Sequence, residues 1–427
     1  MTTSGTTPDV SGLAAELWGE RDPSALVSDR VQHLTAGTMT DWGLSGKRPD
    51  PKVSPISLAG GIPDATTQPR EGLIHAMERA LDTPDDAPLV YGGAHGFEPL
   101  RELIGQFFSR DHPTTPGSDS FVLTNGAAGA IDLVCSALLD PGDVVITELP
   151  TFSGSLRTMR GHQAEIVGVR MDDDGLLVDE VEATILRLEA EGLRIKLIYT
   201  IPTFHNPTGV TMTMERRQQL VELASRHSIF ILEDTAYNEL YFGSEMVPSI
   251  SAVADGHGVI VAGTFSKVIA TGLRVGWVQA QPSLIDAIMP ARFDMGNSPL
   301  LHRTLYQYMV TGEFEQHVSM MRGIYRDKME TLVSRLRDVC EPYATFKQPG
   351  GGFFLWLKLA EGLQSMDVQG KGVEEGAIFA IGRTFYPDRD PGPDGENIRL
   401  AYSWTTFDDL REGADRISRA CADVAGG

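Results

Sequence analysis

The sequence predicts an α/β protein in which a large domain built on a mostly parallel sheet is followed by a smaller α+β domain. Between residues 120 and 280, short apolar runs alternate with segments of helical spacing, and this alternation is typical of parallel strands joined by helices. After residue 283 long helical patterns take over, and the last hundred residues mix strands and helices without a parallel series. This change predicts the second, α+β unit.

Six apolar runs are predicted to be strands of the large sheet. Each is short, rich in Val, Ile and Leu, and apolar on both faces, as expected for strands covered by helices on both sides. They cover residues 120–126, 143–150, 195–202, 229–237, 258–267 and 273–280. Helical spacing fills the intervals, for example in "AAGAIDLVCSALL" and "ERRQQLVELASRHS".

Composition shifts along the chain predict its domain limits. Residues 1–50 are expected to form an N-terminal tail and arm, of which the first twelve, rich in Thr, Ser and Gly, are expected to be disordered. Residues 51–84 are assigned to a linker and the N-terminal part of the small domain. The large domain then covers residues 85–310, and the C-terminal part of the small domain covers residues 311–427.

Charge and cysteine content exclude several classes of function. The 427-residue chain has a formal net charge of -22, which argues against nucleic acid and anionic membranes as partners. Its three cysteines are far apart, so neither a disulfide framework nor a cysteine metal site is indicated. The N-terminus lacks the pattern of a signal peptide, and no apolar stretch is long enough to span a bilayer. We expect a soluble cytoplasmic protein without a bound metal.

Polar and aromatic residues follow the predicted strands where a ligand of a parallel sheet would bind, at the carboxyl ends. Each has an ordinary structural explanation when taken alone, such as a turn, a helix cap, a core aromatic or a salt bridge. Together they place chemically different groups at one edge of the sheet. They are Gly126 at a helix start, Phe152, Asn206, Asp234, Tyr237, Ser266, Lys267 and Arg274.

The groups expected near the middle of this edge fit the ring of pyridoxal phosphate. Lys267 supplies an amine for a Schiff base with the aldehyde, and Asp234 supplies a carboxylate that keeps the pyridine nitrogen protonated. Asn206 and Tyr237 can donate to the ring oxygen, and Phe152 can stack on the ring.

The remaining groups fit its phosphate. The turn Gly126-Ala127-Ala128 offers backbone N–H groups at a helix start, while Ser266 adds a hydroxyl and Arg274 a guanidinium. Lys267 and Arg274 stand in "GTFSKVIATGLRVGW", a segment that is otherwise typical of a buried one. We therefore expect both side chains to be buried, the lysine by its bond to the cofactor and the arginine by the phosphate.

The sequence resembles the fold-type I pyridoxal phosphate enzymes, the aspartate aminotransferase superfamily, and within it the branch of 2-aminoadipate and kynurenine aminotransferases. The resemblance implies a mostly parallel seven-stranded sheet and a homodimer. It extends from about residue 25 to the C-terminus and is carried by "ISLAGGIPD", "YGGAHGFEPLRELI", "FVLTNGAAGAIDL", "DPGDVVITELPTF", "PTFHNPTGVTM", "ILEDTAYNELYF", "GTFSKVIATGLRVGW", "GGGFFLWLKL" and "IRLAYSW".

The resemblance also implies roles for single residues. Lys267 would move the Cα proton of the substrate, and Arg399 would bind the substrate carboxylate through its two-pronged guanidinium. Gly60 and Gly61 would lie against the substrate, which Asn206 would also contact. Tyr91 would reach the cofactor phosphate of the neighbouring subunit.

Recognition of the substrate side chain would fall partly to residues 27–42, where Arg30 could meet an acidic group or cap a helix.

The chain departs from the family pattern at four positions. Ala127 and Ala128 stand where a Ser or Thr and a Gln are common, Phe152 replaces a frequent Tyr, and Thr271 replaces a frequent Pro. The backbone N–H groups at the phosphate are kept, but two side-chain contacts are lost.

Two enzymatic hypotheses follow from these residues. The first is a pyridoxal phosphate-dependent aminotransferase that converts a 2-amino acid to a 2-oxo acid. The alternative is a non-transaminating enzyme that performs elimination, replacement or cyclisation on an amino acid or an adenosylmethionine-like substrate. A third hypothesis, the effector domain of a regulator, is disfavoured because only about fifty residues, without a strongly basic segment, precede "ISLAGG".

Overall fold

The computed structural model describes residues 10–19, 21–32, 34, 53–84, 87–388, 392 and 395–426. Its two compact units are residues 1–36 and residues 37–427. The first contains α1 (Val10–Gly19) and α2 (Asp29–Gln32). Residues 1–9 of the predicted disordered tail lie outside the described residues, whereas residues 10–12 belong to α1, so the prediction of disorder is wrong there. The predicted domain limits within the second unit stay a prediction.

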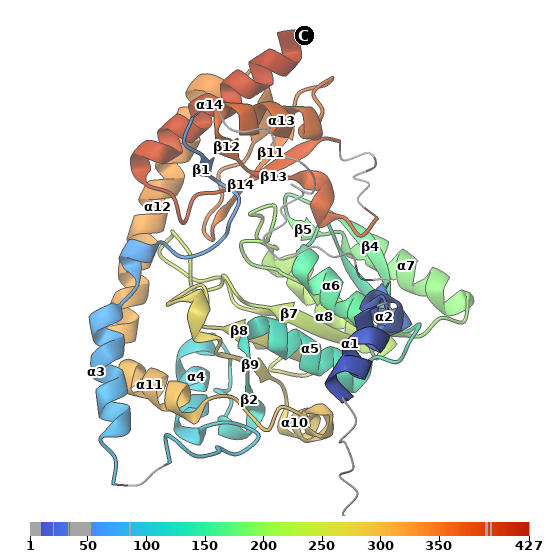
Figure 1. The fold of residues 1–427 in the computed structure, drawn as a ribbon, viewed down its shortest axis with the longest axis vertical. Helices are drawn as coiled ribbons and strands as arrows, with labels where there is room; N and C mark the ends of the chain where they lie inside the picture. Colours follow the sequence, from blue (N-terminus) through green and yellow to red (C-terminus); the bar gives the residue numbers. More distant parts are fainter. Residues whose placement is uncertain are drawn as a thin grey trace, which may run out of the picture. The chain divides into compact units, whose positions relative to one another are not determined.

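The second unit is built around an eight-stranded sheet, shown in Figure 1. Its order is β2 (Phe121–Thr124), β9 (Gly276–Gln279), β8 (Val259–Thr264), β7 (Phe230–Asp234), β6 (Ile195–Thr200), β3 (Val144–Leu149), β4 (Glu165–Asp172) and β5 (Gly175–Leu176). The pairs from β8 to β4 are parallel, and β9 is antiparallel to both of its neighbours. The predicted mostly parallel sheet is confirmed.

The six strands predicted from apolar runs are all present. The strand β4 was not among them, because Glu165, Arg170 and Asp172 interrupt its apolar pattern and most of its residues are partly or fully exposed. The two-residue strand β5 pairs antiparallel with β4 and adds an eighth strand at the edge. The predicted seven strands therefore correspond to the sheet without β5.

The strand β9 begins later than predicted, at Gly276 rather than at residue 273. Arg274 precedes it in the left-handed conformation, with φ 51°. Across the pair of β8 and β9, Gly263 faces Trp277, and a Cβ on Gly263 would lie 2.1 Å from the indole ring. A glycine is therefore required beside this tryptophan.

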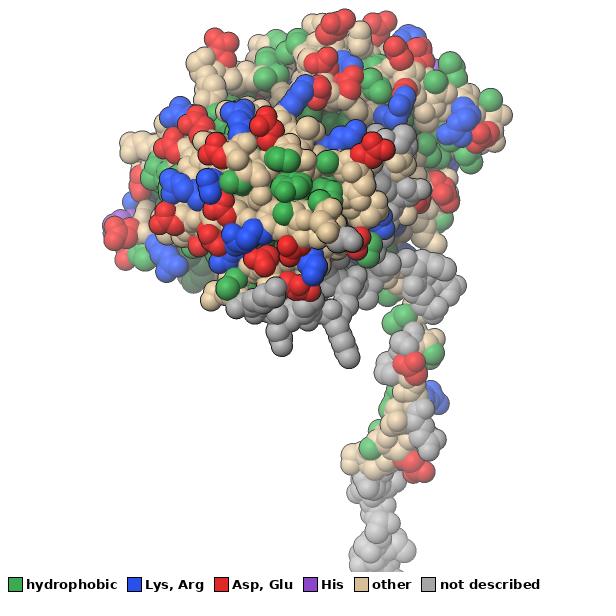
Figure 2. Space-filling model, turned by 90° about the horizontal axis from the view of Figure 1, so that it is seen from above, with side chains coloured by type: hydrophobic (Ala, Val, Ile, Leu, Met, Phe, Trp, Pro, Cys, Tyr) green, Lys and Arg blue, Asp and Glu red, His purple; other side chains and the backbone are tan. Residues whose placement is uncertain are grey.

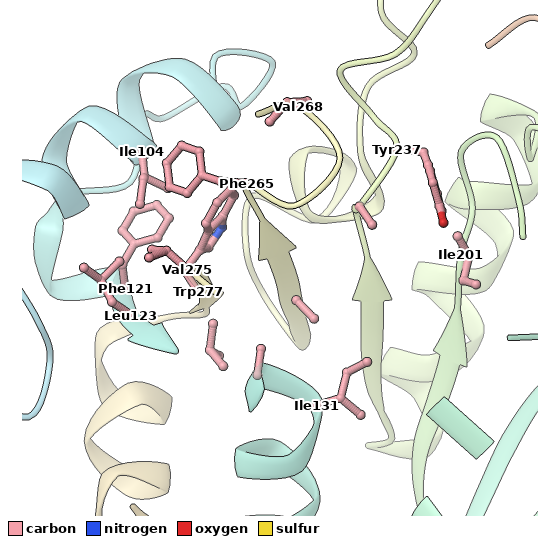
Figure 3. Close-up of a cluster of buried hydrophobic side chains, with 14 of the residues drawn as sticks. Ile104, Phe121, Leu123, Ile131, Ile201, Tyr237, Phe265, Val268, Val275 and Trp277 are labelled. Carbon is pink, nitrogen blue, oxygen red and sulfur yellow. The ribbon is translucent and has the colours of Figure 1, made fainter. Parts of the chain in front are cut away.

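Helices cover both faces of the sheet. These helices are α5 (Gly126–Leu138), α6 (Ser153–Gly161), α7 (Val178–Ala190), α8 (Met214–His227), α9 (Ile250–Val253) and α10 (Pro282–Ile288). Because successive strand residues point to opposite faces, Leu197 and Leu232 belong to one buried cluster, whereas Ile198 and Ile231 belong to another. In Figure 3 the first cluster continues into Phe121, Phe265 and Trp277.

The C-terminal part forms a second, antiparallel sheet with its own core. Its order is β10 (Ala344–Phe346), β11 (Phe354–Leu359), β14 (Asn397–Ala401) and β13 (Ala380–Ile381). The helices α13 (Ser365–Glu375) and α14 (Phe407–Gly426) accompany it. A separate parallel pair joins β1 (Ile56–Ser57) to β12 (Ala377–Ile378). Residues near the N-terminal end of the second unit therefore pack with the C-terminal part.

Four further α-helices lie in the described part of the second unit. Three of them are α3 (Arg70–Leu81), α4 (Glu98–Phe108) and α11 (Pro299–Val310). The long helix α12 (Glu313–Cys340) connects the two cores, because its first half buries residues such as Phe314 in the large core and its second half buries residues such as Leu336 in the C-terminal core. Figure 1 shows α12 running from α11 toward α14.

On the face shown in Figure 2, acidic and basic side chains are interspersed and no extended basic surface is visible. Cys135, Cys340 and Cys421 are free and buried. Among the described residues, none of the helices combines the length and the hydrophobicity that crossing a bilayer requires.

Candidate active site

The ends of β6, β7 and β8 bring the predicted lysine, carboxylate and phenol together. Lys267 Nζ donates a hydrogen bond of 2.9 Å to the carbonyl oxygen of Gly61 and lies 6.0 Å from the centre of the Tyr237 ring. Asp234 is the last residue of β7, and Tyr237 follows it in the next turn. The segment that carries Gly61 therefore closes over the end of the sheet at this lysine.

Asp234 is buried, and each of its carboxylate oxygens accepts a hydrogen bond. Oδ1 accepts from the backbone N–H of Ala236 at 3.1 Å, and Oδ2 accepts from the hydroxyl of Tyr199 at 3.0 Å. Burial raises the pKa of Asp234, while these two hydrogen bonds and the charge of Lys267 oppose the rise. The carboxylate is thus held in a fixed orientation beside the lysine.

The surroundings of Lys267 lower the pKa of its ammonium group. Desolvation lowers the pKa of its ammonium to about 8, although the negative charge of Asp234 opposes this shift. Arg399 and Arg274 lower it further. About a tenth of the amine is therefore uncharged at pH 7, far more than for an unperturbed lysine, and the uncharged form is the one that attacks an aldehyde.

Arg399 is fully buried at the other side of this group. It donates to Asn206 Oδ1 at 2.8 Å and to the carbonyl oxygen of Ala59 at 2.5 Å. Its guanidinium carbon lies 4.4 Å from the centre of the Phe354 ring and 4.7 Å from that of Phe385. Burial lowers the pKa of Arg399 to about 9.

The same short segment accepts hydrogen bonds from both Arg399 and Lys267. The carbonyl of Ala59 accepts from the guanidinium, and the carbonyl of Gly61, two residues later, accepts from the amine. Asn206 connects Arg399 to Tyr237, because its side chain hydrogen-bonds to Tyr237 as well as to Arg399. The arrangement therefore places a guanidinium, which can bind a carboxylate, on the same short segment as the amine of Lys267.

The predicted phosphate groups gather at the start of α5. Arg274 donates to the carbonyl oxygen of Asn125 at 2.9 Å and to Ser266 Oγ at 3.4 Å. Gly126, the first residue of α5, has φ +70°, and a Cβ there would lie 2.6 Å from Arg274 Nη2. A helix N-terminus, a hydroxyl and a guanidinium thus share one location, as in anion sites.

One prediction about this location was wrong. Arg274 is exposed rather than buried. It lies in the turn between the short 3-10 helix Thr271–Leu273 and β9, beyond the end of the strand. Lys267 retains part of its accessible surface, whereas Ser266 is buried.

The other predicted residues lie in more varied places. Ala127 is partly buried and Ala128 exposed in the first turn of α5, and Phe152 precedes the first residue of α6 with its ring near Gly154. Gly60 lies between the two carbonyls that bind Arg399 and Lys267.

Tyr91 and Arg30 are both exposed, and Arg30 belongs to the first compact unit, in α2. Residues 35–42 of the predicted recognition segment lie outside the described residues.

The sequence-based prediction missed Tyr199, Ser155 and Phe354. Tyr199 was the one polar-tipped aromatic in the buried run "IKLIYTIP", and such a residue needs a partner for its hydroxyl. Phe354 stood in the conspicuous "GGGFFLW", where the ring now lies so close to Gly61 that a Cβ there would be 2.3 Å from it. Ser155 had no signal, since its contact depends on how α6 packs.

These residues fit pyridoxal phosphate on structural grounds. The amine of Lys267 has a depressed pKa, the buried carboxylate of Asp234 feels the charge of that lysine, and the absence of a side chain at Gly126 lets the guanidinium of Arg274 approach the start of α5. The donor set, an amine with a carboxylate and an anion site, corresponds to the aldehyde, ring nitrogen and phosphate of this cofactor.

Comparisons with known proteins agree with this fit. The family model "aminotransferase class I and II" matches residues 55–417. The chain is 32% identical over 365 residues to an aromatic-amino-acid aminotransferase of Thermococcus litoralis, covering 85% of this chain and 87% of that protein.

Two solved structures are similar over nearly the whole chain. One is a multiple substrate aminotransferase from Thermococcus profundus, with a TM-score of 0.87, 28% identity and coverage of 95% and 100% of the two chains. The other is an alpha-aminoadipate aminotransferase of Thermus thermophilus, with a TM-score of 0.84, 26% identity and the same coverage. Its complex with N-(5'-phosphopyridoxyl)-L-leucine places the cofactor in a protein of this fold.

These similarities favour transamination over the elimination and replacement alternative. The chain belongs to the class I and II aminotransferases, with the aspartate aminotransferase-like fold type I, and is a pyridoxal phosphate-dependent transferase that aminates and deaminates 2-oxo and 2-amino acids.

Proposed function

We propose that the protein transaminates a 2-amino acid held between Arg399 and Lys267. The observation that carries this proposal is the segment Ala59–Gly61, whose first and last carbonyls accept from the guanidinium and the amine. A 2-amino acid presents a carboxylate and an amino group on neighbouring carbons, so the guanidinium would hold the carboxylate while the amino group lies toward Lys267. The fork of the arginine suits the carboxylate.

The same proposal assigns the cofactor contacts. Lys267 would hold the aldehyde carbon, Asp234 the ring nitrogen, and Asn206 with Tyr237 the ring oxygen. Phe152 would cover one face of the ring. The N–H groups of Gly126, Ala127 and Ala128, with Ser266 and Arg274, would hold the phosphate.

Pyridoxal phosphate supplies, when bound, an aldehyde that exchanges amines and a ring that withdraws electrons from the substrate Cα. The protein supplies the proton transfers and the orientation. Lys267 Nζ would take the proton from the substrate Cα and return it to the former aldehyde carbon of the cofactor, since its amine is partly neutral near pH 8. The ionised Asp234 would keep the ring nitrogen protonated, and Arg399 would fix the plane of the carboxylate.

We also propose that the active unit is a homodimer. Support comes from an exposed apolar surface formed by two loops, with Leu89, Val90, Tyr91, Phe293 and Met295 between 53% and 88% exposed. The loops contact each other, because Arg292 Nη1 donates to the carbonyl oxygen of Ala94 at 2.5 Å. An apolar surface of this kind is typical of a subunit interface. Tyr91 would then contact the phosphate in the partner's site.

The cytoplasmic location remains part of the proposal. Its support is the state of the three cysteines, which are free and buried rather than paired.

The first experiment is a half-reaction. Cofactor-loaded protein is mixed with a panel of aromatic, acidic, cationic and aliphatic amino acids, together with adenosylmethionine, in the absence of any oxo acid. We expect the aminated cofactor and the matching 2-oxo acid to appear in equal amounts, identified by absorbance and mass. Release of a side-chain fragment without aminated cofactor would contradict the proposal.

A second experiment tests the composite site. Lys267→Ala and Tyr91→Ala chains are refolded separately and as an equal mixture. If Tyr91 serves the partner's site, half of the mixed dimers contain both chains and one unaltered site each, so activity returns to about a quarter of wild type. If each site belongs to a single chain, mixing restores nothing.

A further inference from the structure

The hydroxyl of Tyr199 contacts the carboxylate of Asp234. Tyr199 is fully buried in β6, and its hydroxyl donates to Asp234 Oδ2 at 3.0 Å. A second contact of 2.8 Å joins the same hydroxyl to Ser155 Oγ on α6, where the serine is 2% exposed. Two elements distant in sequence thus converge on one carboxylate oxygen.

The direction of these hydrogen bonds follows from their chemistry. An ionised carboxylate only accepts, so the single proton of the Tyr199 hydroxyl is used on Asp234. The phenol oxygen can then only accept from Ser155, whose hydroxyl donates. The result is a directed chain from Ser155 through Tyr199 to Asp234, and burial means that bulk water does not compete with it.

This chain of hydrogen bonds acts on Asp234, whose other neighbours have opposing effects on its ionisation. Burial and the negative charge of Glu148 favour the protonated form of Asp234, whereas the Ala236 N–H, the Tyr199 hydroxyl and the positive charge of Lys267 favour the ionised form. Tyr237 also faces Asp234, and His205 lies 3.1 Å from Glu148. Of the groups that favour ionisation, Tyr199 is the one whose hydroxyl can be removed without changing a charge or the backbone.

We propose that Tyr199, supported by Ser155, is a positioning residue that keeps Asp234 ionised and oriented toward the ring nitrogen of the cofactor. This inference rests on the proposed role of Asp234. Without the hydroxyl, the carboxylate binds a proton more tightly, and the shared proton moves from the ring nitrogen to Asp234. The ring then withdraws fewer electrons from the substrate.

The test is a pH titration of the visible absorbance of the holoenzyme, which reports the ionisation of the nitrogen that joins Lys267 to the cofactor. A protonated ring lowers the pKa of that nitrogen by charge repulsion, so Tyr199→Phe is expected to raise it by about one pH unit. Tyr308→Phe is the matched control, because it removes one hydroxyl from a buried tyrosine of α11 outside the site and is expected to leave the titration unchanged.

Two further variants separate the possible failures. Ser155→Ala is expected to raise the pKa in the same direction by a smaller amount, and it decides the test if Tyr199→Phe does not fold. Asp234→Asn tests the premise. If Asp234→Asn shifts the titration but Tyr199→Phe, or Ser155→Ala in its place, does not, the role of Tyr199 is overturned while that of Asp234 stands. If Asp234→Asn also titrates like wild type, both roles fall.

Discussion

Glu233 and Asp234 end β7 as neighbours in the sequence, and their side chains point to opposite faces of the sheet. Glu233 faces α8 and α9, where it lies 4.0 Å from the buried Arg217. Asp234 faces Tyr199 and Lys267. Each face therefore buries a carboxylate with a cation nearby, and a comparison of the two shows what distinguishes a structural ion pair from a reactive one.

The α8 face satisfies its buried groups internally. Arg217 donates to the carbonyl oxygens of Met212, Pro202 and Pro248 and to Thr203 Oγ1, over distances of 2.8–3.0 Å. Glu233 accepts from the backbone N–H groups of Ile250 and Ser251, both at 2.9 Å. Donors and acceptors are matched by the protein itself, so this face has a structural role.

The face that carries Asp234 and Lys267 differs from the α8 face in how its cation is bonded. Among the described residues, Lys267 Nζ, which has three N–H donors, donates to the carbonyl oxygen of Gly61. Its pKa is lowered to about 8, so the amine can lose its proton under ordinary conditions. The comparison indicates that burial of charge occurs on both faces, whereas reactive groups on only one of them retain bonding capacity for a ligand.

The largest effect is expected from Lys267→Ala. The variant would lose both the amine proposed to bond to the cofactor and the base proposed to move the Cα proton, so turnover should fall by about three orders of magnitude or more. Turnover and the visible absorbance of the bound cofactor measure this. The exposed Lys358→Ala is the control and should retain both. A Lys267→Ala enzyme with wild-type absorbance would contradict the assignment.

The second prediction contrasts the two carboxylates. Asp234→Asn should slow turnover by about 100- to 1000-fold, because the ring nitrogen of the cofactor would lose the ionised partner proposed for it. Glu233→Gln should leave turnover and the cofactor spectrum close to wild type. Steady-state kinetics of both variants measure the contrast. Equal losses in the two variants would show that the faces do not differ in function.

Glu233→Gln should instead change how stability depends on pH. Burial raises the pKa of Glu233 to about 7. In the unfolded chain this carboxyl ionises at its ordinary lower pKa, so the folded state loses stability as the pH rises through that value to about 7. Glutamine does not titrate, and the variant should therefore gain stability relative to wild type over this interval, by up to about 3 kcal/mol. Urea unfolding at pH 5 and pH 8 measures the difference, and a pH-independent difference would contradict the raised pKa.

The third prediction contrasts the two buried arginines. Arg399→Lys keeps the positive charge but loses the fork that suits a carboxylate, so kcat/KM should fall about 100-fold for every amino acid that is a substrate. Arg217→Lys should lower the free energy of unfolding by about 1–3 kcal/mol, because a lysine has one donor fewer than the four contacts require. The folded Arg217→Lys enzyme should keep its kcat/KM, and a comparable loss in both variants would contradict the distinction.

The smallest effect is expected at the phosphate end. A methyl group in Gly126→Ala would displace the guanidinium of Arg274 and should weaken cofactor binding about 10-fold. Gly142→Ala is the matched control, since Gly142 also has a positive φ, of +86°, but has no atom within 4 Å of the added carbon. It should cost about 1 kcal/mol in stability and leave cofactor binding unchanged. Equilibrium binding of pyridoxal phosphate measures both, and equal affinities would remove the Gly126 contact from the proposed site.

Much of the candidate site could be predicted because its residues stand at strand ends. The alternation of apolar runs and helices predicts which chain segments end at the same edge of the sheet, and this was sufficient to bring Asp234, Lys267 and Asn206 together. Arg399 came only from the resemblance, because it lies in β14 of the C-terminal sheet and no local pattern connects that strand to residue 59.

The errors and omissions have a common physical origin. The strand β4 was missed because its polar residues break the pattern, and the exposure of Arg274 was missed because its left-handed turn places it beyond the end of the strand. Tyr199 and Ser155 were missed because their contacts cross from β6 to α6. In each case the decisive interaction joins segments that are distant in the sequence.

Local patterns in the sequence were enough to predict the fold class, the mostly parallel sheet, the family and the residue types at the sheet edge, since these depend on periodicity and on motifs that are local in the chain. The packing of remote segments shows that the hydroxyl of Tyr199 binds Asp234 and that the segment Ala59–Gly61 spans the amine and the guanidinium. Those features depend on which face a side chain occupies and on packing between remote segments. A local sequence pattern contains neither kind of information.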